Sequence, residues 1–269
     1  MPLRLEHKPS LVAYVTCGDP DMETTHAIVL AAIDAGADVV ELGVPFSDPI
    51  ADGPVIQRAS ERALRAGTTL KDVLALARAV RGDRPRAGLI IFSYLNPVLR
   101  LGLARFCAAA AAAGVDGALI TDLTLDEAGE YIACMRQRNL ATVFLAAPTS
   151  PDARLAKIAA ASRGFIYAVS RTGVTGTRAD VSSDAQLLVG RIRKFSKLPV
   201  AVGFGISTPE QFAAVGGWAD AVVVGSAIVE RIESNLGREA QAVAGFIGSL
   251  KRHAAAKLGS AGVRSRAGS

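Results

Sequence analysis

Two carboxylic acids in one short segment, Glu41 and Asp52, are the residues with the clearest capacity for chemistry. Glu41 follows an apolar run at 39–40, which places a carboxyl group at the end of a buried strand. Burial raises the proton affinity of a carboxyl group, whereas a better solvated neighbour keeps its charge. We expect such a pair to carry acid–base chemistry near neutral pH. A solvated loop would explain Asp48 but not Glu41, because a charge ending a hydrophobic strand is costly unless it is used or paired.

The length and composition indicate a folded α/β protein. The chain has 269 residues, of which 50% are hydrophobic, and this suits one large α/β domain or two small ones. No apolar run is long enough to cross a membrane and the N-terminus lacks a signal-peptide core, so we expect a cytoplasmic protein. The three cysteines are widely spaced without a CxxC pair, which indicates reduced thiols rather than disulfides or a metal site.

One cluster of basic residues stands out in a chain of net charge +5, and it lies between Lys251 and Arg266. Aromatic residues are scarce there, so we see no base-stacking platform for nucleic acid. We therefore expect a frayed, solvated terminus. A positive field would also steer anionic small substrates toward the protein.

Short apolar runs alternate with helical segments along the chain. The apolar runs lack polar alternation, which predicts parallel strands buried on both faces. These runs are 11–16, 39–42, 89–92, 118–120, 142–145, 165–169, 200–202 and 221–224. The segments between them are rich in Ala, Leu, Arg and Glu and predict helices at 24–35, 54–66, 70–80, 103–113, 126–138, 153–161, 184–196 and 209–215. We expect three residues to cap helices: Asp152, Ser183 and Thr208.

Eight β/α units predict a parallel (β/α)8 TIM barrel of the α/β class. We expect a single domain over residues 1–269, with its core at about 11–236 and a C-terminal helix and basic tail at 239–269. A doubly wound open sheet is the alternative. That fold usually carries a glycine-rich fingerprint after its first strand, and residues 17–20 do not provide one.

Glycine-rich loops follow the last three predicted strands, at 170–177, 203–207 and 225–227. In barrels, the loops after the seventh and eighth strands and a short extra helix often hold a phosphate. Glycine lets the backbone approach an anion, and the start of a helix offers unpaired N–H groups. We therefore predict a phosphate site here, although Gly173 and Gly203 could simply turn the chain.

These residues together resemble the α subunit of tryptophan synthase. The likeness is carried by four segments, 41–54, 170–176, 203–210 and 225–229, and it extends from about residue 11 to residue 236. The acidic segment is highly specific to that family. Glycine loops of this kind also occur in other phosphate-binding barrels.

The resemblance implies a carbon–carbon lyase of L-tryptophan biosynthesis. It implies retro-aldol cleavage of indole-3-glycerol phosphate to indole and glyceraldehyde 3-phosphate, with no cofactor or metal on this chain. It also implies a partner, the PLP-dependent tryptophan synthase β subunit, which receives indole through an internal passage in an α-β-β-α complex. No nucleic-acid or membrane partner is implied.

The match to the family motif also assigns roles to the two acids. Glu41 would move the protons at ring carbon C3 and at the glycerol hydroxyl next to the ring. Asp52 would accept a hydrogen bond from the indole N–H and stabilise the positive charge that develops there.

Further site residues follow from the same match. Backbone and hydroxyl groups would hold the phosphate at Gly176, Gly205, Gly225 and Ser226. Side chains at strand positions could wall an indole pocket, with plain barrel core as the alternative: Tyr14, Phe92, Leu119, Leu145 and Phe204. Tyr167 matches a family position near the active site. Thr175 would face Asp52 once loops 44–52 and 172–178 close over the substrate.

Two features depart from the family pattern. Only ten residues, including Pro2 and Pro9, precede Leu11, where the family carries an amphipathic helix. Thr124 replaces a usual proline after Asp122, a residue that we expect to orient the closing loop. These departures keep a free-standing indole-3-glycerol phosphate lyase open as the alternative. A weak phosphate-binding activator of a β enzyme and another phosphosugar barrel also stay open.

Other catalytic strategies are not favoured by the positions of the basic residues. None of the three histidines ends a predicted strand, so we do not expect a histidine base. No lysine ends a strand either, which disfavours a Schiff-base aldolase. No His, Asp or Glu cluster has the spacing of metal ligands.

Overall fold

The structure is a computed structural model of the chain, and it describes residues 3, 5, 7–169, 178–203 and 205–266, without the side chains of 178–182 and 258–266. The strands form one parallel sheet in the order β5-β4-β3-β2-β1-β9-β8-β7-β6. Their bounds are β1 Ser10–Thr16, β2 Val39–Gly43, β3 Gly88–Ser93, β4 Gly117–Ile120, β5 Ala141–Val143, β6 Leu145–Ala146, β7 Ile166–Val169, β8 Val200–Gly203 and β9 Ala221–Val224.

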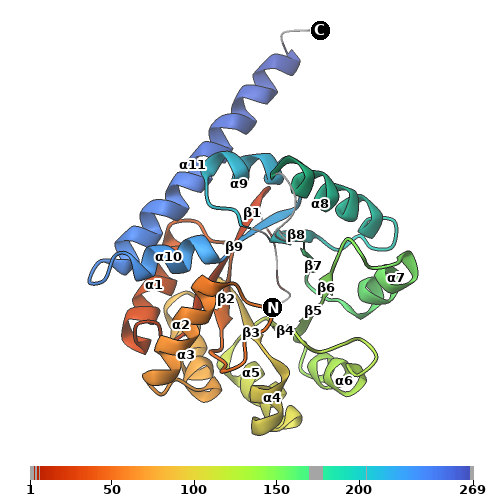
Figure 1. Cartoon of the computed structure of the whole chain (residues 1–269). Helices are drawn as coiled ribbons and strands as arrows, with labels where there is room; N and C mark the ends of the chain where they lie inside the picture. Colours follow the sequence, from red (N-terminus) through yellow and green to blue (C-terminus); the bar gives the residue numbers. More distant parts are fainter. Residues whose placement is uncertain (1–2, 4, 6, 170–177, 204, 267–269) are drawn as a thin grey trace.

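The sheet closes into a barrel through a strand that is interrupted at Phe144. β5 pairs with β4, and β6 pairs with β7. The Tyr167 N–H donates to the Phe144 carbonyl at 3.1 Å. The predicted strand at 142–145 is thus divided because its two halves bond to different neighbours. Since these halves make one strand position, the nine strands form the predicted eight-stranded (β/α)8 barrel (Figure 1).

Helices surround the barrel and bury the outer face of the sheet (Figure 1). Their bounds are α1 Met22–Asp34, α2 Pro54–Arg65, α3 Leu70–Asp83, α4 Leu95–Leu101, α5 Leu103–Ala113, α6 Gly129–Gln137, α7 Asp152–Ala161, α8 Arg178–Ile192, α9 Pro209–Gly216, α10 Ser226–Glu233 and α11 Glu239–Arg266. None of the helices in the described part of the chain has the length and hydrophobicity needed to cross a bilayer.

The barrel interior has its own apolar core, because successive residues of a strand point to opposite faces. Val12, Val39, Ile90 and Leu119 pack in this inner cluster. Leu3 and Leu5 pack against the same cluster, so the N-terminal segment contributes to the interior. The alternate residues of each strand pack outward against the helices.

Several predicted helix boundaries differ from the structure. Thr208 caps α9 as predicted, with a complete capping box to Gln211. Asp152 is the first residue of α7 and Pro151 precedes it, while Ser183 lies inside α8. Both predicted caps were wrong, because α7 already begins at Asp152 and α8 begins before Ser183. A turn at 125–127 and the N-cap Ala128 precede α6, where 126–138 was predicted to be helical.

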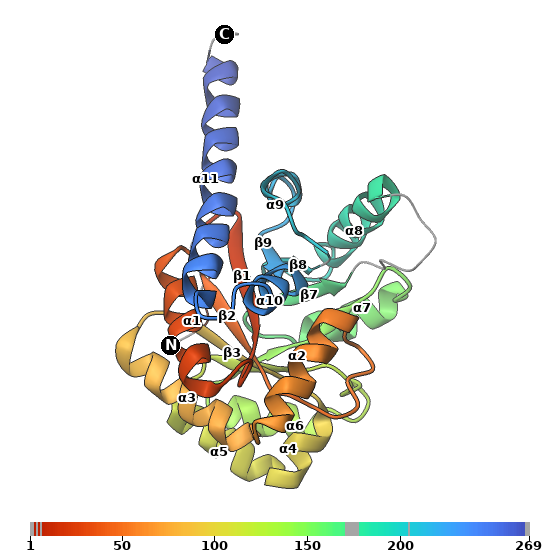
Figure 2. The ribbon, with the colours of Figure 1, turned by 60° about the vertical axis from the view of Figure 1, so that its left-hand side comes forward.

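The C-terminal segment is helical rather than frayed. α11 runs to Arg266, packs against α1 and α9, and extends beyond the barrel (Figure 2). The Lys251 ammonium donates to Asp38 at 3.0 Å, which ties the helix to the start of β2. One of the basic residues in this segment is therefore part of the packed structure.

Candidate active site

Glu41 lies inside the barrel as a buried and unpartnered acid. It occupies the middle of β2 rather than the predicted strand end, because the strand continues to Gly43. It lies on the same face as Val39 of the inner core and pairs in register with Tyr14 and Ile90. Its side chain is 0% exposed. Neither carboxyl oxygen has a hydrogen-bond partner among the described residues. Burial raises the pKa of Glu41 to about 8, so the group is a neutral proton donor at about pH 7.

Asp52 lies in the loop between β2 and α2, where the side chains of Tyr94 and Gln57 position it. The Tyr94 hydroxyl donates to Asp52 Oδ2 at 3.1 Å and accepts from the Ala51 N–H at 3.0 Å. The Gln57 amide donates to the Asp52 carbonyl at 2.8 Å. Burial raises the pKa of Asp52 to about 6, and the Tyr94 hydrogen bond opposes that rise. Asp52 is therefore largely ionised at the pH where Glu41 is neutral.

Two tyrosines lie within electrostatic reach of these acids. Burial raises the pKa of Tyr14 and of Tyr167, and the charges of Asp52 and Glu41 raise both further. Each ring needs a glycine on the neighbouring strand. A Cβ at Gly43 would lie 2.4 Å from the Tyr14 hydroxyl, and one at Gly203 would lie 2.3 Å from the Tyr167 hydroxyl. The structure thus brings both predicted tyrosines to the two acids.

Apolar side chains surround the same region. The rings of Tyr14 and Phe92 meet edge to face with centroids 5.1 Å apart. Phe92 and Leu145 are half-buried beside the inner core, so they have surface to offer a ligand. Leu119 is fully buried within that core. Phe204 lies outside the described residues.

The predicted phosphate end is partly described. α10 starts at Ser226, after Gly225, and a Cβ at Gly225 would lie 3.5 Å from the Tyr14 side chain. The first N–H groups of a helix have no intrahelical partner, so donors are available beside Tyr14. Gly205 is exposed and has φ +48°, a conformation that favours glycine. Gly176 and Thr175 lie outside the described residues.

Tyr94 is a site residue that the sequence pattern did not predict. It follows β3, and its ring also lies 5.0 Å from that of Phe46 in the Asp52 loop. Asp122 supports it, because its carboxylate accepts the Leu95 N–H at 2.7 Å, next to Tyr94 at the start of α4. The signal that could have identified Tyr94 from the sequence is its position as an aromatic residue directly after a strand. In the described parts of the chain, no cluster of His, Cys, Asp or Glu is arranged to hold a metal ion.

Comparison with known proteins gives a consistent answer. A model of the family described as tryptophan synthase alpha chain matches residues 2–257. The tryptophan synthase alpha chain of Solibacter usitatus is 54% identical over 233 residues, covering 87% of this chain and 87% of the relative. That of Geobacter sulfurreducens is 49% identical over 253 residues, covering 93% of this chain and 94% of the relative.

Solved structures share the fold. A chain of tryptophan synthase from M. tuberculosis, in its aminoacrylate-bound form, is 37% identical with a TM-score of 0.83 and covers 92% of this chain and 93% of that one. Tryptophan synthase subunit alpha from Legionella pneumophila is 34% identical with a TM-score of 0.84, covering 91% and 92%. The chain therefore belongs to the tryptophan synthase alpha chain family, with a lyase role in tryptophan synthesis.

Proposed function

We propose that this chain cleaves indole-3-glycerol phosphate to indole and glyceraldehyde 3-phosphate by a retro-aldol reaction. The observation that carries the proposal is the difference in pKa between two carboxyl groups in one site. The pKa of Glu41 is raised to about 8 and that of Asp52 to about 6, in both cases by burial. One acid can therefore donate a proton while the other stabilises positive charge, and the reaction needs no cofactor on this chain.

The proposed reaction uses the Glu41 carboxyl group twice, first as a proton donor and then as a proton acceptor. Glu41 first protonates C3 of the indole ring, and Asp52 accepts the ring N–H and stabilises the positive charge that develops there. The Glu41 carboxylate then takes the proton of the hydroxyl next to the ring. The bond from C3 to that carbon breaks, its electrons return to the ring, and an aldehyde forms. Glu41 ends protonated, as it began.

The substrate phosphate is assigned to the end of the barrel that carries α10. Within the described residues, the proposed phosphate donors are the backbone N–H groups of Gly225 and Ser226. Gly205 lies in the loop after β8. Gly176 completes the proposed set from the loop after β7. The indole ring is assigned to the region beside Tyr14 and the half-buried apolar side chains.

The proposed partner is a PLP-dependent β subunit that receives the indole in an α-β-β-α complex. The similar chain from M. tuberculosis was solved as part of tryptophan synthase. The Asp52 loop of the present chain carries Ile50, which is 86% exposed. Because Ile50 lies next to the proposed catalytic Asp52, we assign the partner surface to this end of the barrel.

Indole release from indole-3-glycerol phosphate by the purified chain tests the proposal, with and without a tryptophan synthase β subunit. We expect slow release that rises sharply with the β subunit. Glu41→Gln should lower both rates by roughly 10²-fold to 10⁴-fold, the range for losing a general acid–base group. Asp48→Asn is the matched control for the rate without the β subunit, because this exposed carboxylate lies in the same loop and should leave that rate unchanged.

The other outcomes separate the alternatives. Fast release without the β subunit would favour a free-standing lyase. Stimulation of the β subunit that survives loss of Glu41 would favour a weak activating partner. No release under any condition would overturn the retro-aldol assignment.

A further inference from the structure

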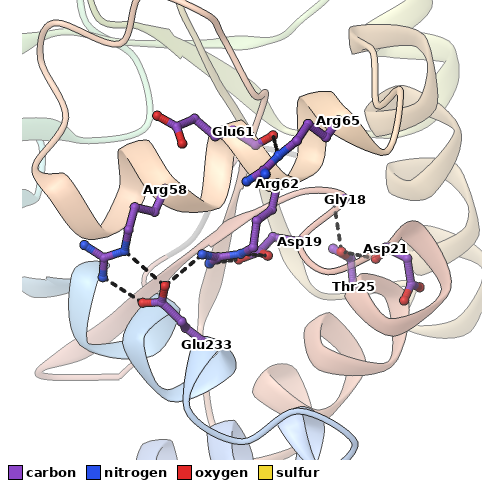
Figure 3. Close-up of polar contacts among 9 residues, drawn as sticks. All are labelled: Gly18, Asp19, Asp21, Thr25, Arg58, Glu61, Arg62, Arg65 and Glu233. Atoms are coloured by element: carbon purple, nitrogen blue, oxygen red, sulfur yellow. Dashed lines mark hydrogen bonds and ion pairs between the residues drawn. The ribbon is translucent and has the colours of Figure 1, made fainter.

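Three elements around the proposed site are joined by one chain of ion pairs (Figure 3). Arg62 of α2 donates through Nε and Nη2 to the two carboxylate oxygens of Asp19, at 2.7 and 2.9 Å. Its Nη1 donates to Glu233 at the end of α10, at 2.8 Å. Arg58, one turn earlier on α2, donates to both oxygens of Glu233. Arg62 therefore links α2 to α10 and to the loop after β1.

The Asp19 end of this chain is buried and fixed. Asp19 is 2% exposed, and Arg62 is its one side-chain partner among the described residues. The neighbouring Gly18 N–H donates to the Thr25 hydroxyl at 3.0 Å, which ties the loop to α1. A Cβ at Gly18 would lie 2.0 Å from the Thr68 hydroxyl, so the loop also packs tightly against the residues after α2.

An ion pair with one buried partner is a poor device for stability, because the desolvation of Asp19 offsets much of the attraction to the partly exposed Arg62. It is better suited to fixing geometry, since the planar guanidinium holds a carboxylate in one bidentate orientation. Here the geometry that is fixed is the position of α2 relative to α10. The same two helices also pack through Ala59 and Val229 over the Tyr14 ring.

Both helices reach the proposed site at the end away from Arg62. α2 begins at Pro54, two residues after Asp52, and its first turn holds the Asp52 carbonyl through Gln57. Arg62 lies about 12 Å along that helix from its start. α10 begins at Ser226, in the proposed phosphate site, and ends at Glu233. A shift of either helix can therefore pass to the other through Arg62, which, unlike Arg58, also holds the buried Asp19.

We infer that Arg62 is a positioning residue that couples occupancy of the phosphate end at α10 to the placement of Asp52 at the indole ring. This inference rests on the proposed function and adds a specific residue to it. Arg62 touches neither the substrate nor the reacting atoms, and it acts through α2 and α10.

The test is calorimetric titration with indole, without and with saturating inorganic phosphate. In the wild-type chain, phosphate should tighten indole binding several-fold, within the usual range of about 5-fold to 150-fold for coupled sites. In Arg62→Met, the effect of phosphate on the indole affinity should be much smaller, with only the Arg58–Glu233 pair still joining the two helices. The same variant should lower kcat for indole-3-glycerol phosphate by about tenfold or more, because small misplacements of catalytic groups are costly.

Matched variants separate coupling from loss of folding. The double variant Asp19→Asn with Arg62→Met removes both charges, so no unpaired buried carboxylate remains, and it should lose the coupling as fully as Arg62→Met. Arg84→Met removes another bidentate pair, to Asp34, and should keep the coupling. A merely structural role for Arg62 would lower the melting temperature and leave the phosphate effect on indole binding intact.

The outcomes also distinguish this inference from the proposed function. A wild-type chain that neither binds indole nor cleaves the substrate overturns the proposed function, and the inference with it. An active wild-type chain without coupling, or with the same coupling in the folded double variant, overturns the inference alone.

Discussion

The unusual feature at the scale of single residues is that Glu41 and Asp52 share one site but hold their protons differently. Glu41 is completely buried without a partner, whereas Asp52 receives a hydrogen bond from Tyr94 and is partly solvated. Desolvation raises both pKa values, but it acts more fully on Glu41. The environment of each group, rather than its chemical type, therefore sets its proposed role.

The proton positions predict a bell-shaped pH dependence of kcat/KM. Activity should rise as Asp52 ionises near pH 6 and fall as Glu41 ionises near pH 8. Tyr94→Phe removes a hydrogen bond that favours the ionised form of Asp52, so the pKa of Asp52 should rise. We expect the acidic limb to move up by about one unit while the alkaline limb stays in place.

The measurement is kcat/KM from pH 5 to 9 for both proteins. Tyr131→Phe is the matched control, because it removes another buried hydroxyl, bonded to the Ala118 carbonyl outside the proposed site. Its profile should match that of the wild-type chain. Movement of both limbs in Tyr94→Phe, or of neither, would contradict the role given to the Tyr94 hydrogen bond.

The sequence revealed the two acids but not Tyr94, the hydrogen-bond partner of Asp52. Glu41 could be predicted because a carboxyl group in an apolar run is costly, and this cost is visible locally. The Tyr94 hydroxyl meets Asp52 across 42 residues of sequence, and that contact exists only once β3 and the loop after β2 are placed side by side. Arg62 and Asp19 were missed for the same reason, since their separation is 43 residues.

At the scale of elements, α4 links the fourth strand to the proposed site. Asp122, after β4, accepts the N–H of Leu95, the first residue of α4. Tyr94 precedes that residue and holds Asp52, so Asp122 acts on the site through the start of a helix. Asp122→Ala should lower the free energy of unfolding by about 1 kcal/mol, as for loss of a helix-capping group.

Asp122→Ala should also lower kcat, and its effect should not add to that of Tyr94→Phe, because both act on Asp52 through one route. Urea unfolding and steady-state kinetics on the two single variants and the double variant form the test. Thr208→Ala is the control, because it removes a comparable helix cap at α9. Fully additive effects on kcat would show that Asp122 does not act through Tyr94.

The strand pattern predicted the barrel well because parallel strands buried on both faces leave a strong local signal. Element boundaries were predicted less well. The break at Phe144 depends on which neighbour each half-strand meets, and this is a property of the closed barrel. α4 was not predicted, because its seven residues are too short to show a helical period.

At the scale of the whole molecule, the barrel separates a packed interior from a reactive end. Leu3 and Leu5 pack against the inner core, whereas the two acids, the tyrosines and the start of α10 gather together in the proposed site. The Asp52 loop therefore lies between the proposed catalytic residues and any partner that binds at that end of the barrel. This loop carries Ile50, which at 86% is the most exposed large apolar side chain in the described structure.

We predict that Ile50 contacts the β subunit and not the substrate. Ile50→Ser should leave basal indole release unchanged and raise the half-saturating concentration of the β subunit by about tenfold, the effect of losing one good interface contact. Titrating the rate of indole release with the β subunit measures this. Leu187→Ser is the matched control, since Leu187 is 67% exposed on α8 and should leave the titration unchanged. A lower basal rate with an unchanged half-saturating concentration would instead place Ile50 in the closing of the loop over the substrate.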